Sequence, residues 1–244
     1  MIEENYKMFL EELQKAIQIS NYTLNNEQLE QFNKLYNEII EWNKKINLTA
    51  ITDPSDFAIK HIIDSISIWD EEKFSNAKTV IDVGTGAGFP GIPLKIYKND
   101  INITLLDSLN KRIQVLQGIT EKLALKNIFL IHSRAEDVAH NKNFRESFDI
   151  AVSRAVARLN ILVEYCLPFV KVGGYFIALK GANVDDELSE AKKAIKLLGG
   201  DNIECVNFQL PNGDKRNIIY IKKVSNTPDN FPRKAGIPEK KPLI

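Results

Sequence analysis

Residues 79–107, TVIDVGTGAGFPGIPLKIYKNDINITLLD, decide the fold that this sequence predicts. The segment opens with a short β-branched run over 79–83 and continues into a turn with three glycines, Gly84, Gly86 and Gly88. A helical stretch follows, and a second apolar run over 103–107 ends in Asp107. In parallel α/β sheets a ligand binds at the carboxyl ends of the strands, where glycines let the backbone approach it closely. The segment therefore predicts a ligand site as well as a fold.

The sequence after this segment repeats the alternation of strand and helix. Short apolar runs that we interpret as strands lie at 128–132, 148–153 and 175–179. Helical stretches separate them, at about 110–125, 158–170 and 185–198. Short apolar strands alternating with helices predict a parallel sheet that is covered by helices on both faces.

The end of the sheet is predicted to differ in direction. Strand-like runs near 203–210 and 217–221 flank Pro211-Asn212-Gly213-Asp214, and an Asn-Gly turn between two strands is typical of a hairpin. The fold class is therefore α/β, a Rossmann-like and mostly parallel sheet with an antiparallel terminal hairpin. From 226 onward the chain is basic and contains prolines, and we expect an extended surface segment there.

Helices are predicted before the sheet. In 27–46 the apolar residues recur at the three-and-four spacing of an amphipathic helix. A shorter helix is expected over 6–19, and another from Pro54, after the capping residue Asp53, to about Trp69. We therefore divide the chain into three parts: a helical N-terminal extension over 1–75, an α/β domain over 76–225 and a basic tail over 226–244.

The charge of the chain limits its partners. With 32 Lys and Arg against 32 Asp and Glu, the net charge is zero, which argues against a generally cationic nucleic-acid coat protein. The charge is uneven, however, because residues 1–76 hold seven lysines and fourteen acids, and residues 214–244 hold eight Lys and Arg and three acids. A polyanionic partner would therefore meet only part of the surface; ordinary surface charge is the alternative interpretation.

The composition also predicts the compartment. No apolar run approaches the roughly 20 residues of a membrane-spanning helix, and the acidic N-terminus differs from a secretory or transit signal. Two cysteines in apolar settings, Cys166 and Cys205, favour buried free thiols over a disulfide framework. We expect a cytoplasmic protein that does not enter a membrane.

The spacing of the glycines indicates the ligand. A dinucleotide site favours Gly-x-Gly-x-x-Gly, but Phe89 stands where the third glycine would be. This departure favours a ligand without a pyrophosphate, such as S-adenosylmethionine, and Asp107 is placed to accept both hydroxyls of its ribose. Together these features predict a class I S-adenosylmethionine-dependent methyltransferase. The alternative, that Asp82 and Asp107 only cap helices or turns, stays open.

The methyl acceptor is narrowed by motifs that are missing. Methylation of an exocyclic base amine commonly uses an Asn/Asp-Pro-Pro-aromatic motif after the fourth strand, where this chain has Ser153-Arg154-Ala155-Val156. Methylation of pyrimidine C5 needs a cysteine nucleophile, and neither cysteine is well placed for that role. The histidines show no metal-ligand spacing, so no metal site is expected: His61, His132 and His140. Guanine N7 fits this inventory because it carries a lone pair and no proton, so that alignment and charge placement suffice.

Several strings of this sequence resemble one family. They are WNKKINLTA at 42–50, His61-x-x-Asp64-Ser65, DVGTGAGFPGIP at 82–93, and Ser153-Arg154-Ala155. They are similar to the GidB family, also called RsmG, which comprises bacterial small-subunit ribosomal RNA guanine-N7 methyltransferases. The resemblance implies a class I methyltransferase fold with a helical N-terminal extension. It also implies methylation of one guanine in the decoding-region loop of 16S rRNA, with S-adenosylhomocysteine as the product.

The resemblance also implies site residues. Gly84 and Phe89, with Gly86 of the same turn, would line the cofactor site, Asp107 would hold the ribose, Ala135 and Glu136 would meet the adenine edge, and Arg154 would complete the pocket. The basic residues expected near the open face, toward rRNA, are Arg134, Lys180 and Arg216; for Lys180 a solvated strand end is the alternative.

No general base or nucleophile is assigned, and Arg154 is the one candidate for a part in catalysis beyond positioning. His61 is interpreted either as a substrate contact or as a structural histidine, and Lys111-Arg112 as surface charge. The expected partner is 16S rRNA in the small ribosomal subunit, and the expected state is a monomer.

Three other functions remain as alternatives. A methyltransferase of this fold could act on a small molecule or a protein, although the basic tail, Arg154 and Arg216 favour RNA. A second alternative is a protein that senses S-adenosylmethionine without catalysis. The third is an NAD-dependent oxidoreductase, which Phe89 and the terminal hairpin disfavour.

Overall fold

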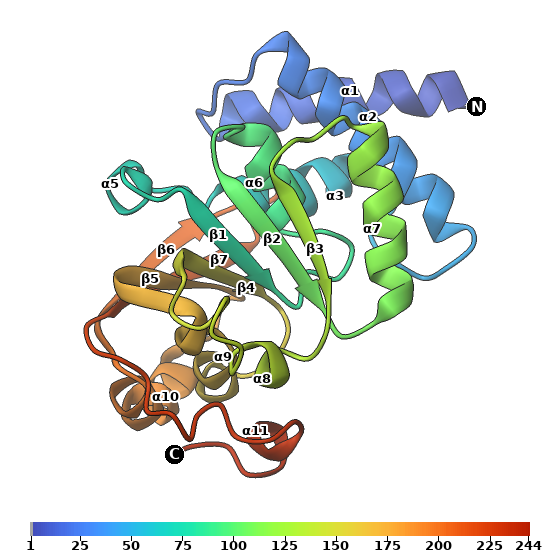
Figure 1. The fold of residues 1–244 in the computed structure, drawn as a ribbon. Helices are drawn as coiled ribbons and strands as arrows, with labels where there is room; N and C mark the ends of the chain where they lie inside the picture. Colours follow the sequence, from blue (N-terminus) through green and yellow to red (C-terminus); the bar gives the residue numbers. More distant parts are fainter. Residues whose placement is uncertain (1) are drawn as a thin grey trace.

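A single seven-stranded sheet forms the centre of the computed structural model, which describes residues 2–244, with side chains from residue 7 onward (Figure 1). The strand order is β3-β2-β1-β4-β5-β7-β6, with β1 to β5 parallel and β7 antiparallel to both neighbours. The predicted mostly parallel sheet with a terminal hairpin is therefore confirmed. The strands are β1 Thr79–Val83, β2 Asn102–Asp107, β3 Ile128–His132, β4 Phe148–Arg154, β5 Val170–Lys180, β6 Gly200–Gln209 and β7 Lys215–Lys223.

The order of the strands fixes where a ligand can bind. From β1 the chain builds outward to β2 and β3 on one side and then returns to β4 and β5 on the other. The switch point lies between β1 and β4, and the carboxyl ends of both strands open at the same edge. The register pairs Val83 with Leu106, and Asp82 with both Leu105 and Val152. The glycine turn, Asp107 and Arg154 consequently emerge side by side.

The N-terminal helices pack on one face of the sheet (Figure 1). Phe9 and Phe32 share a core with Val80 of β1 and Leu116 of α7. The second helix begins at a capping box, in which Asn25 Oδ1 accepts the backbone N–H of Gln28 at 2.9 Å and Gln28 Oε1 accepts that of Asn25. The elements of this layer are α1 Ile2–Ile19, α2 Asn26–Asn43, α3 Pro54–Phe57, the π-helix Ala58–Ile63, α4 Asp64–Ile66, α6 Gly91–Tyr97 and α7 Asn110–Lys122.

The other face of the sheet has a second core. Ile81, which alternates with Val80 along β1, packs there with Leu162 and Ile195. The helices on this side are α8 Ala135–Val138, α9 Leu159–Cys166 with the 3-10 turn Leu167–Phe169, and α10 Asp185–Leu197. A short α5, Glu71–Phe74, precedes β1, and α11, Ile237–Lys240, lies near the C-terminus.

Three local predictions differ from the structure. The helix expected from Pro54 to about Trp69 ends at Ile66 and contains a π-helical turn. Strand β5 starts at Val170 instead of 175, because Val170 pairs with Phe148 at the start of β4, ahead of a shift in register. The tail from 226 is not an extended surface segment, since Phe231 is buried and α11 packs against α9. Among the described residues, no helix is long and apolar enough to span a bilayer.

Candidate functional site

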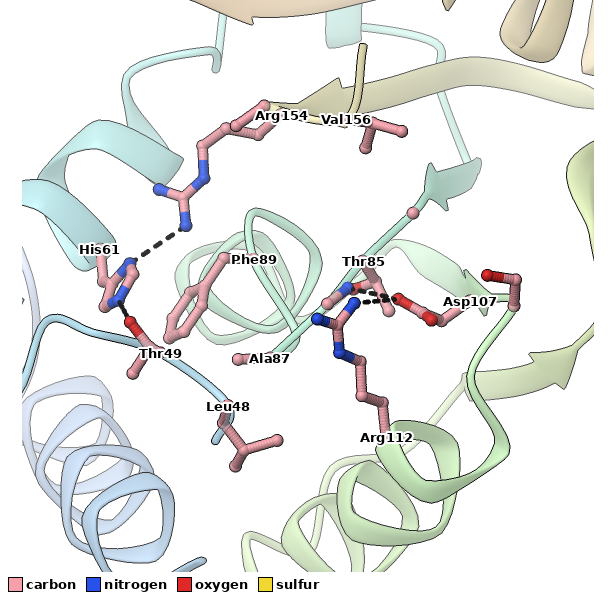
Figure 2. A pocket seen from close by; sticks show the side chains of 14 residues that line it. Leu48, Thr49, His61, Thr85, Ala87, Phe89, Asp107, Arg112, Arg154 and Val156 are labelled. Atoms are coloured by element: carbon pink, nitrogen blue, oxygen red, sulfur yellow. Dashed lines mark hydrogen bonds and ion pairs between the residues drawn. The ribbon is translucent and has the colours of Figure 1, made fainter. Parts of the chain in front are cut away.

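A cavity of about 380 Å³ opens at the carboxyl ends of β1, β2 and β4 (Figure 2). Asp107 and Arg112 lie on one side of Phe89, and Arg154, His61 and Thr49 on the other. A second cavity, of about 110 Å³, adjoins the first and shares Gly84 and Asp107 with it. The remaining residues that line the first cavity are Leu48, Gly84, Thr85, Gly86, Ala87, Ser108, Ala155 and Val156.

The glycine turn favours glycine at two positions because of their backbone conformation, and the space beside the two positions differs. Gly84 and Gly86 both have positive φ, +76° and +60°, which side-chain-bearing residues rarely adopt. A Cβ at Gly84 would lie 2.5 Å from Val156 Cγ2, so Val156 or the turn would have to move to make room for it. A Cβ at Gly86 would meet nothing nearer than the Gly84 carbonyl at 4.0 Å. The space beside Gly86 is therefore open to a bound molecule.

Asp107 fastens the turn and also reaches the cavity. Its carboxylate is 3% exposed; Oδ2 accepts the backbone N–H of Gly86 at 2.9 Å, and Oδ1 accepts that of Leu109 at 2.8 Å. Arg112 Nη1 lies farther away, at 3.4 Å from Oδ2. Capping, the alternative interpretation of Asp107, therefore describes part of its role, while its place in the cavity wall leaves it accessible to a ligand.

Asp82 also stabilises this turn, but it does not line the cavity. Its Oδ2 accepts the Thr85 hydroxyl at 2.7 Å and the Gly91 N–H at 2.9 Å, whereas its buried Oδ1 finds no partner among the described residues. Burial raises the pKa of Asp82 to about 6. Asp82 is thus a structural carboxylate, as the capping interpretation holds.

The raised pKa of Asp82 predicts an unusual dependence of stability on pH. Because the folded-state pKa lies above the usual 3.8, this carboxyl stabilises the fold fully below pH 3.8 and loses that contribution as the pH rises through about 6. Asparagine at position 82 cannot titrate. When the pH is raised from 4 to 7.5, the free energy of unfolding of Asp82→Asn should therefore increase by about 1–3 kcal/mol relative to that of the wild type at the same pH. Urea unfolding at both pH values measures this difference, with the exposed Asp229→Asn as control. A difference between variant and wild type that stays constant with pH would contradict the assignment.

Arg154 joins the helical extension to the sheet. Its Nη1 donates to the Lys60 carbonyl at 2.9 Å and to Asp64 Oδ2 at 3.1 Å, and its Nη2 donates to His61 Nδ1 at 3.1 Å. Its Cζ lies 5.3 Å from the centre of the Phe89 ring, a cation–π contact. Three elements far apart in the sequence are therefore fixed around one partly buried guanidinium.

The hydrogen bonds around His61 define its protonation. Arginine only donates, so Nδ1 accepts from Arg154, and the ring proton sits on Nε2, which donates to Thr49 Oγ1 at 2.8 Å. Burial, with Arg154 nearby, lowers the pKa of His61 to about 3, so the ring is neutral. Thr49 Oγ1 also accepts the Ile51 N–H at 3.0 Å, which leaves the hydroxyl proton of Thr49 to a bound molecule. His61 also stacks on Phe89 at 4.2 Å within the cavity wall, and these contacts within the protein favour the structural interpretation.

The structure brings the predicted cofactor residues together. The main cavity is lined by Gly84, Gly86, Phe89, Asp107 and Arg154. The adjoining cavity is lined by Ala135 and Glu136, with Arg134 at its exposed side. Glu136 itself is almost fully buried, and its Oε1 accepts the Gly236 N–H at 2.9 Å.

The three basic residues expected near RNA differ in exposure. Arg134 is exposed, and Arg216 is partly exposed and pairs with Asp64 at 3.2 Å. Lys180 is not at the open face: its ammonium group is buried, donates to the Ala157 carbonyl at 2.6 Å and pairs with Glu187 at 2.7 Å. The expectation for Lys180 differs from the structure because the loop after β4 and the first turns of α10 cover the end of β5.

Arg112 and Thr49 are among the cavity residues to which the sequence pattern gives no site role. The sequence predicts surface charge for Arg112, yet it lies in the first turn of α7, five residues after Asp107, and points back to it (Figure 2). Thr49 lies in a loop with no local signal of its own. Its only marker is membership of the string 42–50, which resembles the family.

Comparisons with known proteins agree with this geometry. Residues 28–219 match the family model GidB, described as rRNA small subunit methyltransferase G. A ribosomal RNA small subunit methyltransferase G of Clostridium botulinum (strain Alaska E43 / Type E3) is 52% identical over 230 residues, which are 94% of this chain and 96% of that protein. The protein of the same name from Desulforamulus reducens is 50% identical over 232 residues, 95% of this chain and 97% of the other.

Solved structures agree in fold. An O-methyltransferase from Bacillus cereus in complex with SAH superposes with a TM-score of 0.55 at 15% identity, covering 78% of this chain and 90% of that one. A putative O-methyltransferase from Klebsiella pneumoniae gives a TM-score of 0.52 at 13% identity, covering 77% and 90%. At these identities the likeness shows only the methyltransferase fold. Through the match over 28–219 and its close relatives, the chain belongs to the GidB family of rRNA small subunit methyltransferase G.

Proposed function

We propose that this protein transfers a methyl group from S-adenosylmethionine to N7 of one guanine in the decoding-region loop of 16S rRNA and releases S-adenosylhomocysteine. The observation that carries the proposal is the cavity at the switch point, where the glycine turn, Asp107 and Arg154 meet in a chain of this family. The family's name supports small-subunit rRNA as the substrate, and the lack of base-amine and cysteine motifs in the sequence supports guanine N7 as the acceptor.

The residues present fit S-adenosylmethionine. The open space beside Gly86 admits a ligand against the backbone of the turn. A carboxylate offers about four acceptor positions, and Asp107 uses two for the N–H groups of Gly86 and Leu109. A ribose hydroxyl would take the position of the long Arg112 contact at 3.4 Å. The adjoining cavity beside Ala135 and Glu136 would take the adenine.

The chemistry asked of the protein is alignment. The bound cofactor supplies a methyl group on a sulfonium centre, and guanine N7 supplies a lone pair without a proton to remove. His61 is unsuited to act as a base because its Nδ1 already accepts from Arg154 and its Nε2 proton is donated to Thr49. Arg154 and Phe89 therefore serve to position the reacting groups and to place charge beside them.

We propose Arg134 and Arg216 as RNA contacts because both side chains reach the surface, and we propose no such role for the buried Lys180. The three-part division into 1–75, 76–225 and 226–244 and the monomeric state also stand as proposals. We also propose that the protein is cytoplasmic and that its partner there is the small ribosomal subunit.

The function can be tested by supplying methyl-labelled S-adenosylmethionine with three acceptors: naked 16S rRNA, small subunits that lack the modification, and a total protein fraction. We expect label in N7-methylguanine of 16S rRNA. Label in the protein fraction, with none in 16S rRNA, would contradict the proposal and support the first alternative. Tight binding of S-adenosylhomocysteine without transfer to any acceptor would support the sensor.

A further inference from the structure

The C-terminal tail, residues 226–244, folds back against the helices of the second core instead of leaving the molecule (Figure 1). Its main anchor is Arg233, which donates through its backbone N–H, Nε and Nη2 to the fully buried carboxylate of Glu164, at 2.6–3.2 Å. A buried carboxylate without a partner is costly, so this pair holds the tail in one place.

A second anchor lies nearer to the start of the tail. Arg145 donates to the backbone carbonyls of Thr227, Pro228 and Phe231 at 2.8–3.1 Å. His140 Nε2 donates to the carbonyl of Pro232 at 2.8 Å. The tail is thus bound through its backbone as well as through Arg233, and the chain beyond it is directed toward α8.

From these anchors the tail reaches the smaller cavity. The Gly236 N–H donates to Glu136 Oε1 at 2.9 Å, and the Tyr165 hydroxyl donates to Glu239 Oε1 at 3.3 Å. Tyr165 and Glu239 line the smaller cavity together with Asp107 and Glu136. The part of the chain matched by the family model ends at 219, before this segment begins.

The end of the cavity formed in this way is rich in hydrogen-bond acceptors. One carboxylate oxygen of Glu136 accepts a hydrogen bond from the tail backbone. The carboxylate of Glu239 accepts from the Tyr165 hydroxyl and is otherwise exposed. Carboxylates accept hydrogen bonds and do not donate them, so such a wall suits a ligand edge that carries an amine. Adenine presents such an edge at its exocyclic N6 amine.

We infer that the C-terminal tail is part of the cofactor site, in which Glu239 accepts a hydrogen bond from the N6 amine of adenine and Tyr165 orients Glu239. This rests on the proposed function, since it takes S-adenosylmethionine as the ligand. The tail then contributes to recognition of the adenine base of the cofactor, and its anchors at Glu164 and Arg145 position Glu239.

The test is calorimetric binding to the full-length protein. The ligands are S-adenosylhomocysteine and the analogue in which hydrogen replaces the N6 amine. Glu239→Ala should lower the affinity for S-adenosylhomocysteine about tenfold. This is a modest effect for a charged hydrogen bond, because Glu239 is exposed. The wild type should bind the analogue about tenfold more weakly than S-adenosylhomocysteine, and Glu239→Ala should bind both ligands alike. Tyr165→Phe should give part of the loss.

Asp229→Ala is the matched control, an exposed acid of the same tail that does not line either cavity. It should bind like the wild type. The inference is overturned if Glu239→Ala binds S-adenosylhomocysteine with an affinity within twofold of the wild type. It is also overturned if the substitution lowers the affinities for S-adenosylhomocysteine and for the analogue by the same factor. Failure of the wild type to bind S-adenosylhomocysteine would instead count against the proposed function.

Discussion

Gly84→Val is expected to lower the affinity for S-adenosylhomocysteine at least about 100-fold. Gly84 has a φ of +76°, which a β-branched residue adopts only at a cost of about 1–3 kcal/mol. Its new Cβ would lie 2.5 Å from Val156 Cγ2, so either the turn or Val156 must move. Both residues line both cavities, and either movement narrows the site.

Calorimetry with S-adenosylhomocysteine measures this effect, and circular dichroism establishes that the variant is folded. Gly118→Ala in α7 is the matched control, because a Cβ there meets nothing within 4 Å, and it should bind like the wild type. Gly86→Ala is the second variant. Its Cβ clashes with no protein atom, so a loss of binding in a folded Gly86→Ala protein comes from the ligand space or from the strain of alanine at a φ of +60°, and not from a clash within the protein. A folded Gly84→Val protein that binds within tenfold of the wild type would refute the placement of the cofactor.

Arg154→Leu is expected to reduce methyl transfer at least about 100-fold and to lower the free energy of unfolding by about 3 kcal/mol. The substitution leaves His61 Nδ1 and the Lys60 carbonyl without their donor, and Asp64 keeps only its contact with Arg216. Since the variant loses stability as well as activity, it does not by itself separate the two roles.

Arg154→Lys separates them. Lysine keeps the charge but is a single ammonium group, which cannot reach Lys60, His61 and Asp64 together as the planar guanidinium does. We expect turnover to fall at least about tenfold while most of the stability is retained. Turnover, cofactor affinity and urea unfolding are the measurements, with Arg158→Lys, an exposed surface pair with Glu190, as control. Wild-type turnover in Arg154→Lys would show that the geometry of the guanidinium is not needed.

Much of the fold could be predicted because its signals are local. The β-branched run of β1, the glycine turn and the apolar run ending at Asp107 lie within 29 consecutive residues, and their order alone predicts the ligand edge of a parallel sheet. The Asn-Gly turn likewise predicted the antiparallel pairing of β6 and β7.

The features that were missed depend on partners far away in the sequence. The tail has the composition of a solvated segment, but Arg233 pairs with Glu164, 69 residues earlier. Lys180 is predicted to lie near the open face toward rRNA, and only the packing of α10 shows that Glu187 and the Ala157 carbonyl enclose its ammonium group. The role of Arg112 depends on where α7 starts relative to Asp107, which periodicity fixes only to within a few residues.

The most direct test of the function is to map N7-methylguanine along 16S rRNA from cells with and without this protein. We predict that one guanine in the decoding-region loop is methylated in the first and unmethylated in the second. Expression of the wild type should restore the modification, and expression of the Gly84→Val variant should not. An identical set of N7-methylguanines in both cells would contradict the account.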